Sequence, residues 1–212
     1  MLEFRGFLHV GETLRRVTAG PVGAWPSKGG TMKVGILSDS HGNLVALMKA
    51  VRLFNDLQVE AVVHCGDWDA SFMMKALSRV KGRVIGILGN CDGEKEGMRR
   101  LAKALGWEFS IPPYETEIGR RRFLLLHEPD QLEERAWSGR YDVILHGHAH
   151  ALPESQNGGE RVEKLGSTLI INPGEAGGWI HGRATAALLD TETLGGEIVE
   201  LMRPEVFERG LS

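Results

Sequence analysis

The sequence predicts an α/β protein whose first sheet is parallel and whose second sheet is partly antiparallel. Three short apolar runs, at residues 33–38, 61–64 and 84–88, are each followed by a segment with helical periodicity. Strands that alternate with helices form a parallel sheet. After Gly106 the pattern changes to short strand-like segments separated by turns, which predicts the second sheet.

Apolar spacing places each element along the chain. A helix follows the first strand, because apolar residues recur on one of its faces at Leu44, Leu47, Met48, Val51 and Phe54. Two more helices are expected near residues 71–79 and 94–105. The second sheet is expected to contain strands at residues 115–118, 122–126, 143–145, 168–171, 184–189 and 197–201, and the polar stretch 154–159 is expected to be an exposed loop.

The composition is that of one globular domain. The chain has 212 residues, of which 42% are hydrophobic and 25% charged, and this balance argues against disorder. A net charge of −3 provides no global positive field for binding a nucleic-acid backbone. Two cysteines are too few for a disulfide framework, which predicts a reducing, cytoplasmic setting. No apolar run approaches the roughly 18 residues of a membrane helix, and the first residues lack the apolar stretch of a signal peptide.

Residue types that bind metals stand where the predicted strands end. They are Asp39, His41, Asp67, Asn90, His127, His148 and His150. In open parallel sheets, ligands bind at the carboxyl edge, so we expect these side chains to converge despite their separation in sequence. Taken singly, each has a plainer interpretation. Asp39 and Asp67 suit helix N-caps, Asn90 suits a turn, and His127 suits a hydrogen-bonded core position.

Taken in order, Asp-x-His, Gly-Asp, Gly-Asn, His and Gly-His-x-His resemble the calcineurin-like metallophosphoesterase superfamily. The segments SDSHGN, GNCD, GHAH and NPG are similar to those of its small single-domain phosphodiesterases from bacteria and archaea. The resemblance covers residues 32–201. It implies a four-layer α-β-β-α sandwich of two mixed sheets flanked by helices, the metallo-dependent phosphatase-like fold. Residues 32–212 would form this domain, and residues 1–31 an N-terminal extension that is disordered, an alternative start or an arm packed on the domain.

The resemblance implies two divalent metal ions bridged by Asp67 and a water, with a bridging hydroxide attacking phosphorus in line. Asp39, His41 and His150 would complete one site, and Asn90, His127 and His148 the other. Mixed carboxylate, amide and imidazole ligands suit Mn, Ni, Fe or Zn, with Mn as the first expectation. Two divalent ions contribute about +4 and two carboxylates about −2, so the site would attract an anionic phosphoester.

Two positions depart from the broad superfamily pattern. Cys91 stands where most members have a histidine that is proposed to assist the leaving group, although the resembled branch also shows GNCD. The catalytic candidates are therefore Asn90, Cys91 and Asp92, and Asp92 either orients a neighbour or caps the helix near residue 94. Glu128 follows His127 where the family usually has glycine, and we keep His127 as a predicted ligand.

Other residues have mainly structural interpretations. His64 is expected to be a buried hydrogen-bonded histidine, and strand alternation points His146 away from His148. Asn172, in NPG, either lines the cleft and binds substrate or forms a plain turn. Cys65 is expected in the core. Trp68, Trp137 and Trp179 either pack in the core or line a substrate mouth.

The predicted function is thus a metal-dependent phosphoric ester hydrolase, with a non-catalytic metal-binding interaction scaffold on the same fold as the alternative. Every expected type of metal ligand is retained, which favours the enzyme. The chain has no Gly-x-x-x-x-Gly-Lys-Ser/Thr, so a phosphate-loop enzyme is not expected. The expected partner is a small phosphoester, with nucleotides among the candidates. We expect no membrane or extended nucleic-acid duplex as partner, and self-association of the chain is left open.

Overall fold

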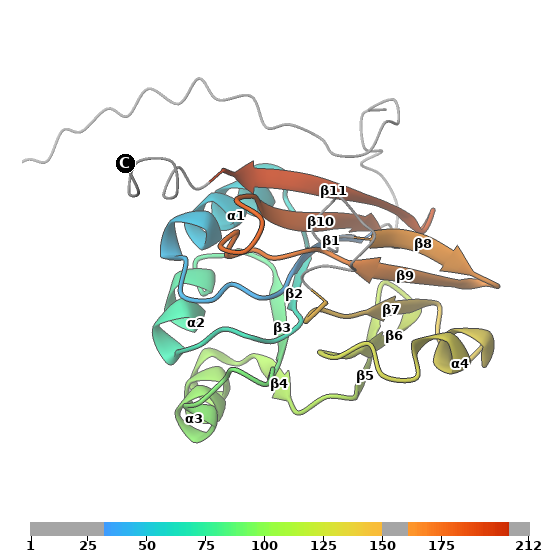
Figure 1. Ribbon diagram of the computed structural model, residues 1–212, viewed down its shortest axis with the longest axis horizontal. Coiled ribbons are helices and arrows are strands. Elements are labelled where there is room, and N and C mark those ends of the chain that lie inside the picture. Colours follow the sequence, from blue (N-terminus) through green and yellow to red (C-terminus); the bar gives the residue numbers. More distant parts are fainter. Residues whose placement is uncertain (1–31, 150–160, 204–212) are drawn as a thin grey trace, which may run out of the picture.

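The computed structural model describes residues 32–149 and 161–203, which form two sheets between helices (Figure 1). The strands of the first sheet are β1 (Lys33–Leu37), β2 (Ala61–His64), β3 (Arg83–Ile87), β4 (Glu108–Ser110), β10 (Ala184–Asp190) and β11 (Gly195–Met202). Their order in the sheet is β11-β10-β1-β2-β3-β4. The strands β1 to β4 run parallel, so their carboxyl ends meet at one edge.

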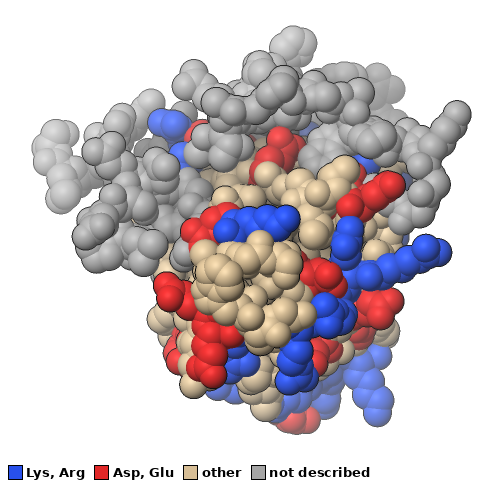
Figure 2. Space-filling view, turned by 90° about the vertical axis from the view of Figure 1, so that its right-hand side faces the viewer, with Lys and Arg blue, Asp and Glu red and all other residues tan. Residues whose placement is uncertain are grey.

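The second sheet is partly antiparallel, as predicted. Its strands are β5 (Tyr114–Ile118), β6 (Arg121–Leu125), β7 (Val143–Leu145), β8 (Arg161–Leu165) and β9 (Thr168–Asn172). Their order is β5-β6-β7-β9-β8, in which β6, β7 and β9 run parallel and the two outer strands antiparallel. On the face of the molecule in Figure 2, acidic and basic side chains are interspersed among the described residues.

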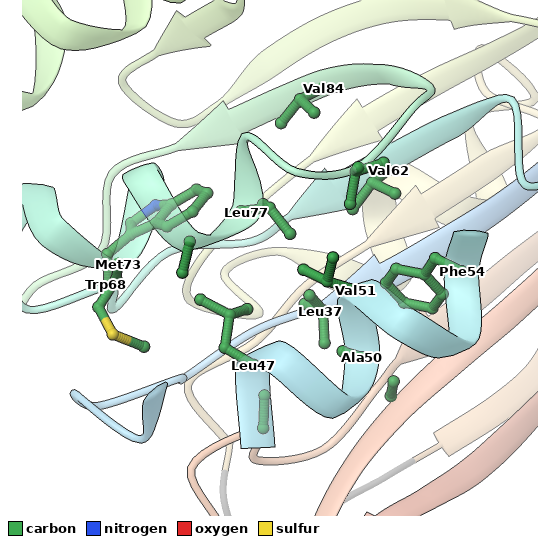
Figure 3. Packing of buried hydrophobic residues seen from close by; sticks show 14 of the residues in the cluster. Leu37, Leu47, Ala50, Val51, Phe54, Val62, Trp68, Met73, Leu77 and Val84 are labelled. Atoms are coloured by element: carbon green, nitrogen blue, oxygen red, sulfur yellow. The ribbon is translucent and has the colours of Figure 1, made fainter. Parts of the chain in front are cut away.

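Helices cover the outer faces of both sheets. The first sheet carries α1 (Leu44–Asp56), α2 (Ser71–Leu77) and α3 (Lys95–Leu105), and the second carries α4 (Leu132–Trp137). Figure 3 shows how α1 packs, with Leu47, Val51 and Phe54 directed at the strands. The predicted four-layer sandwich is therefore confirmed.

The alternation of side chains along the strands builds two separate cores. Val62 and Val84 face the helices, whereas Val63 and Ile85, one residue further along, face the second sheet. Val143 and Leu145 of β7 pack against the latter from the second sheet. Because both faces of the central strands are buried, the sheet edge with the carboxyl ends is held in a rigid frame.

The structure corrects the assignment of the last two strands. We expected residues 184–189 and 197–201 in the second sheet, but β10 pairs antiparallel with β1, from Lys33 opposite Asp190 to Ile36 opposite Ala187, and β11 pairs with β10. The alternation in a strand specifies which face is buried but not which strand is its neighbour. The short elements β4, β8 and α4 were not predicted.

Two predicted segments lie outside the described residues. These are the N-terminal extension 1–31 and the loop 154–159. Within the part of the chain that the structure describes, no helix is long and apolar enough to cross a membrane.

Candidate metal centre

Six of the seven predicted metal ligands meet at the carboxyl ends of the strands. Asp39 and His41 follow β1, Asp67 follows β2, Asn90 follows β3, His127 follows β6, and His148 follows β7. The seventh, His150, lies outside the described residues. Five contacts join neighbouring side chains within 4 Å and the sixth joins the His148 N–H to Asp39. The six residues thus form a closed ring of contacts in the order Asp39, His41, Asp67, His127, Asn90 and His148.

The backbone at this edge is held in an unusual conformation. Asp39, His41, Asp67 and His148 all have positive φ, at 54°, 40°, 58° and 61°, and so does Asp69 at 72°. This left-handed region is uncommon for residues other than glycine, although Asn, Asp and His tolerate it best. Such conformations persist where the surrounding structure enforces them, and they cluster at functional sites.

Three glycines explain why the motifs read Gly-Asp, Gly-Asn and Gly-His. A Cβ atom on Gly66 would lie 2.6 Å from His127 Nδ1, and one on Gly89 would collide with the Asp67 carboxylate. A Cβ atom on Gly147 would lie 2.6 Å from Asp39 Oδ2. Each glycine therefore allows one loop to approach a ligand carried by another loop.

One half of the centre is built around His127, whose side chain is 2% exposed. Its Nδ1 lies 2.8 Å from the main-chain oxygen of Cys65, which fixes the ring and directs Nε2 into the site. That Nε2 lies 2.7 Å from Asn90 Oδ1 and 3.4 Å from Asp67 Oδ2. His148 Nδ1 lies 2.9 Å from the same Asn90 oxygen. Asn90 is therefore more than a turn residue, since its amide joins both histidines.

The other half is built around His41, whose side chain is 20% exposed. Its Nε2 lies 3.7 Å from Asp67 Oδ2 and 3.9 Å from Asp39 Oδ1. Asp39 is anchored in turn, because its Oδ2 accepts a hydrogen bond of 3.1 Å from the His148 N–H. Neither Asp39 nor Asp67 caps a helix, since α1 is capped by Asn43 and α2 begins after Ala70.

Asp67 is shared by the two halves. One of its carboxylate oxygens faces both His41 and His127, and the other accepts a hydrogen bond of 2.9 Å from the Cys91 N–H. Burial alone would raise the pKa of Asp67, but the His127 ring and the Cys91 N–H outweigh it and hold the pKa below its usual range. Burial likewise opposes charge on His127, yet the Asp67 carboxylate raises the pKa of this histidine. A shared anionic oxygen between two imidazoles suits a bridging metal ligand.

Asp92 braces the loop that carries Asp67. Its Oδ1 accepts hydrogen bonds from the Trp68 and Asp69 N–H groups at 2.8 and 3.0 Å, and its Oδ2 from the Asp67 and Gly89 N–H groups at 3.2 and 2.7 Å. It does not cap α3, where the N-cap is Glu94. Of the two interpretations from sequence, the structure supports the orienting one.

Cys91 lies exposed at the edge of the centre. Among the described residues, two groups have candidate ligand atoms that all lie within 4.8 Å of one another. One contains the Cys91 Sγ, His41 and Asp67, and the other contains Asp67, His127 and His148. Burial and the Asp67 carboxylate raise the pKa of the Cys91 thiol to about 11, so the thiol keeps its proton at neutral pH.

The residues with structural interpretations lie mostly outside the ring. His64 is fully buried, stacks on Trp68 with ring centroids 3.6 Å apart, and has Nε2 3.1 Å from Ser40 Oγ. Burial lowers the pKa of His64 to about 3. His146 and Cys65 are buried too.

The Asn172 side chain forms a turn, accepting the Gly174 N–H at 3.0 Å, and it also donates to the Ala149 main-chain oxygen at 3.3 Å. The three tryptophans singled out from the sequence have different environments. Trp68 is core, Trp137 lies exposed on α4, and Trp179, which is 37% exposed, donates its indole N–H to the His41 main-chain oxygen at 2.9 Å. Only Trp179 is therefore both exposed and attached to the centre.

Sequence analysis did not single out Asp69. Its Oδ1 lies 3.2 Å from His41 Nδ1, on the side of the ring away from Asp67. The available signal was a second aspartate in Gly66-Asp67-Trp68-Asp69, two residues after a predicted ligand.

The donor set fits a pair of divalent metal ions. Carboxylate, amide and imidazole atoms from four other loops surround the shared carboxylate of Asp67. Both His41 and His127 have the outer ring nitrogen held by an oxygen, as metal-binding histidines do. A centre of this kind at the carboxyl edge of an α-β-β-α sandwich defines the class of metal-dependent hydrolases.

The chain belongs to the calcineurin-like phosphoesterase superfamily, whose domain model matches residues 32–194. It is 38% identical over 165 residues to phosphodiesterase MJ0936 of Methanocaldococcus jannaschii, covering 76% of this chain and 94% of that protein. Phosphodiesterase YfcE of Escherichia coli is 27% identical over 146 residues, which cover 61% of this chain and 74% of YfcE.

Solved structures agree with these sequence matches. A novel archaeal phosphodiesterase matches with a TM-score of 0.72 and 34% identity, over 80% of this chain and 99% of that one. Vps29 of Entamoeba histolytica complexed with zinc matches with a TM-score of 0.55 and 15% identity, over 81% of this chain and 100% of that one, and shows the fold alone. The predicted family and the predicted class of enzyme, a phosphoric ester hydrolase, are confirmed.

Proposed function

We propose that the chain is a phosphodiesterase that hydrolyses small phosphodiesters with two divalent metal ions. The observation that carries the proposal is the position of Asp67, whose Oδ2 lies 3.7 Å from His41 Nε2 and 3.4 Å from His127 Nε2. One carboxylate between two histidine-bearing groups suits two adjacent ions. The names of the relatives, both phosphodiesterases, support diesters as the substrate class.

The two positions would be held by different residues. Asp39, His41 and His150 would complete one with Asp67, and Asn90, His127 and His148 the other. When bound, the two ions would supply Lewis-acid charge and an activated water for in-line displacement at phosphorus. We propose Mn as the native metal, with Ni, Fe or Zn as alternatives, because the mixed oxygen and nitrogen donors suit these ions.

Residues of the chain position the bridging carboxylate and hold a proton at the edge of the centre. The His127 ring and the Cys91 N–H keep Asp67 charged, and the hydrogen bonds to Asp92 fix its loop in place. Cys91 retains its thiol proton at the exposed edge, as a general acid must.

The substrate we propose is small and anionic, with an aromatic part. Acidic and basic groups are mixed on the face in Figure 2 and the net charge is −3, which speaks against an extended nucleic-acid duplex. Trp179 offers an exposed indole beside His41 for stacking, which makes nucleotides candidates. Free thiols at Cys65 and Cys91 suit the reducing conditions of the cytoplasm, where we propose the enzyme acts.

Hydrolysis of bis(para-nitrophenyl) phosphate tests this function. Metal-stripped protein would be assayed with Mn, Ni, Fe, Zn or Mg added back, beside His148→Ala in the ring of ligands and Glu133→Gln on the exposed surface of α4. We expect metal-dependent turnover that His148→Ala abolishes and Glu133→Gln preserves. Metal binding without turnover for any ion would contradict the proposal and favour the interaction scaffold.

A further inference from the structure

His41 has a carboxylate on each side of its ring. Its Nε2 faces Asp67 and Asp39 inside the centre, while its Nδ1 lies 3.2 Å from Asp69 Oδ1 on the outside. A neutral imidazole carries one N–H and one lone pair, and the hydrogen bond made by one nitrogen decides which of them the other presents. An N–H at Nδ1 that donates to Asp69 leaves the lone pair on Nε2, directed at the shared oxygen of Asp67.

Asp69 is itself held in place, although its side chain is 39% exposed. Its backbone N–H donates to Asp92 Oδ1 at 3.0 Å, and its φ of 72° directs the chain out of the Asp67 loop. The backbone of Asp69 is therefore fixed by the same carboxylate that holds the Asp67 loop, which places the Asp69 side chain beside His41.

The contrast with His127 shows what Asp69 adds. His127 Nδ1 lies 2.8 Å from a neutral acceptor, the main-chain oxygen of Cys65. His41 Nδ1 faces a side-chain carboxylate, and a charged acceptor makes a stronger hydrogen bond and a stronger ligand of the opposite nitrogen. The main-chain acceptor survives any substitution, whereas the carboxylate can be removed by one.

We propose that Asp69 is a positioning residue that fixes the ring of His41 and thereby sets the affinity of one of the two metal positions. This inference rests on the proposed two-metal centre. Because the Asp69 carboxylate contacts the His41 ring, it should control the more open position and leave the His127 position little changed.

Titration calorimetry of metal-stripped protein with MnCl₂ tests the inference. Asp69→Asn keeps an oxygen acceptor and tolerates the positive φ, while Asp69→Ala removes the acceptor. We expect one of the two binding steps to weaken by about 10- to 100-fold in Asp69→Ala and by less in Asp69→Asn. Asp56→Asn, at the exposed end of α1, removes one carboxylate charge elsewhere and should leave both steps unchanged.

A double-mutant comparison separates positioning from a general loss of structure. In a His127→Ala background, Asp69→Ala should still weaken the remaining step, and in a His41→Ala background it should have no further effect. Affinities within twofold of wild type for both Asp69 variants would overturn the inference, as would an undiminished effect in the His41→Ala background. Because the titration measures binding, a chain that binds Mn as expected but hydrolyses no diester would contradict the proposed function alone.

Discussion

The two halves of the metal centre share Asp67 but are built by different means. Around His127, the ring is 2% exposed and fixed by a main-chain oxygen at the end of a buried strand. Around His41, the ring is 20% exposed and fixed by the side chain of Asp69 in a loop. The His127 ring is part of the folded core, whereas the His41 ring is more open to solvent.

This difference suggests that the His127 half contributes to the stability of the fold and the His41 half sets the affinity for metal. Removing His127 affects contacts that also hold the two sheets' edges together, because its ring touches Gly66 and Cys65 on one side and Asn90 on the other. Removing the support of His41 affects the exposed Asp69 carboxylate and the partly exposed His41 ring. We therefore expect the His127 half to be formed before metal binds and the His41 half to decide how tightly the second ion is held.

Replacement of Asp67 should have the largest effect on activity, because both halves of the centre share its carboxylate. Asp67→Asn keeps the shape and the positive φ but loses the bridging charge. We expect diester hydrolysis to fall by more than about 100-fold, beyond the usual cost of removing a supporting residue. Steady-state assays with saturating Mn would show it, and activity within tenfold of wild type would contradict a bridging role.

Replacing His127 or His41 by asparagine tests whether the two halves contribute differently to the stability of the fold. In the presence of a chelator, His127→Asn should lower the free energy of unfolding by about 1–3 kcal/mol, because buried partners lose their hydrogen bonds. His41→Asn, at a positive φ that asparagine tolerates, should change it by less than about 0.5 kcal/mol. Urea denaturation measures both, and equal losses would show that the halves do not differ in this way.

The buried histidine beneath the His41 loop predicts a pH dependence. Burial lowers the pKa of His64 to about 3, so the unfolded chain binds a proton below about pH 6.5 that the folded chain does not. Stability should therefore fall with falling pH between these values, by up to about 1.4 kcal/mol per unit.

His64→Gln removes this contribution. Between pH 7 and 5.5, the metal-free variant should lose about 1 kcal/mol less stability than wild type. The raised pKa of His127 acts in the opposite direction, but it is present in both proteins and cancels from the difference. Parallel pH profiles for the two proteins would contradict the assignment of a neutral, buried His64.

The smallest effect is expected for Trp179, at the exposed edge of the metal centre. Trp179→Ala removes an exposed indole hydrogen-bonded to the His41 backbone, and should raise KM for an aromatic diester about 2- to 10-fold with kcat little changed. The matched control is Trp137→Ala, because the Trp137 side chain is 66% exposed on α4. An equal effect of both substitutions, or a change in kcat alone, would exclude stacking at Trp179.

The sequence predicted the elements that place the ligands better than it predicted the sheets. Apolar spacing found β1, α1, β2, α2, β3 and α3 in order, and the ligands were sought where those strands end. The pairing of β10 with β1 was missed, since no local pattern specifies a strand's neighbour. The family resemblance and the retained ligand types gave the enzyme class.

The difference between the two halves could not be predicted from sequence. His41 and His127 are the same residue type after the same kind of strand, and only the fold shows which ring is buried. Asp69 and Asp92 act through contacts that span loops, with the Asp92 carboxylate gathering amides from residues 67–69 and 89. Both aspartates stand close to predicted ligands in the sequence, but only the fold shows which groups they contact.

Anomalous diffraction from crystals soaked in MnCl₂ would test the two-metal account most directly. The account predicts two manganese peaks on either side of the Asp67 carboxylate, one beside Asp39 and His41 and one among Asn90, His127 and His148. The peak beside His41 should lose occupancy first as the Mn concentration is lowered. A single peak, or peaks that do not share Asp67, would contradict the account.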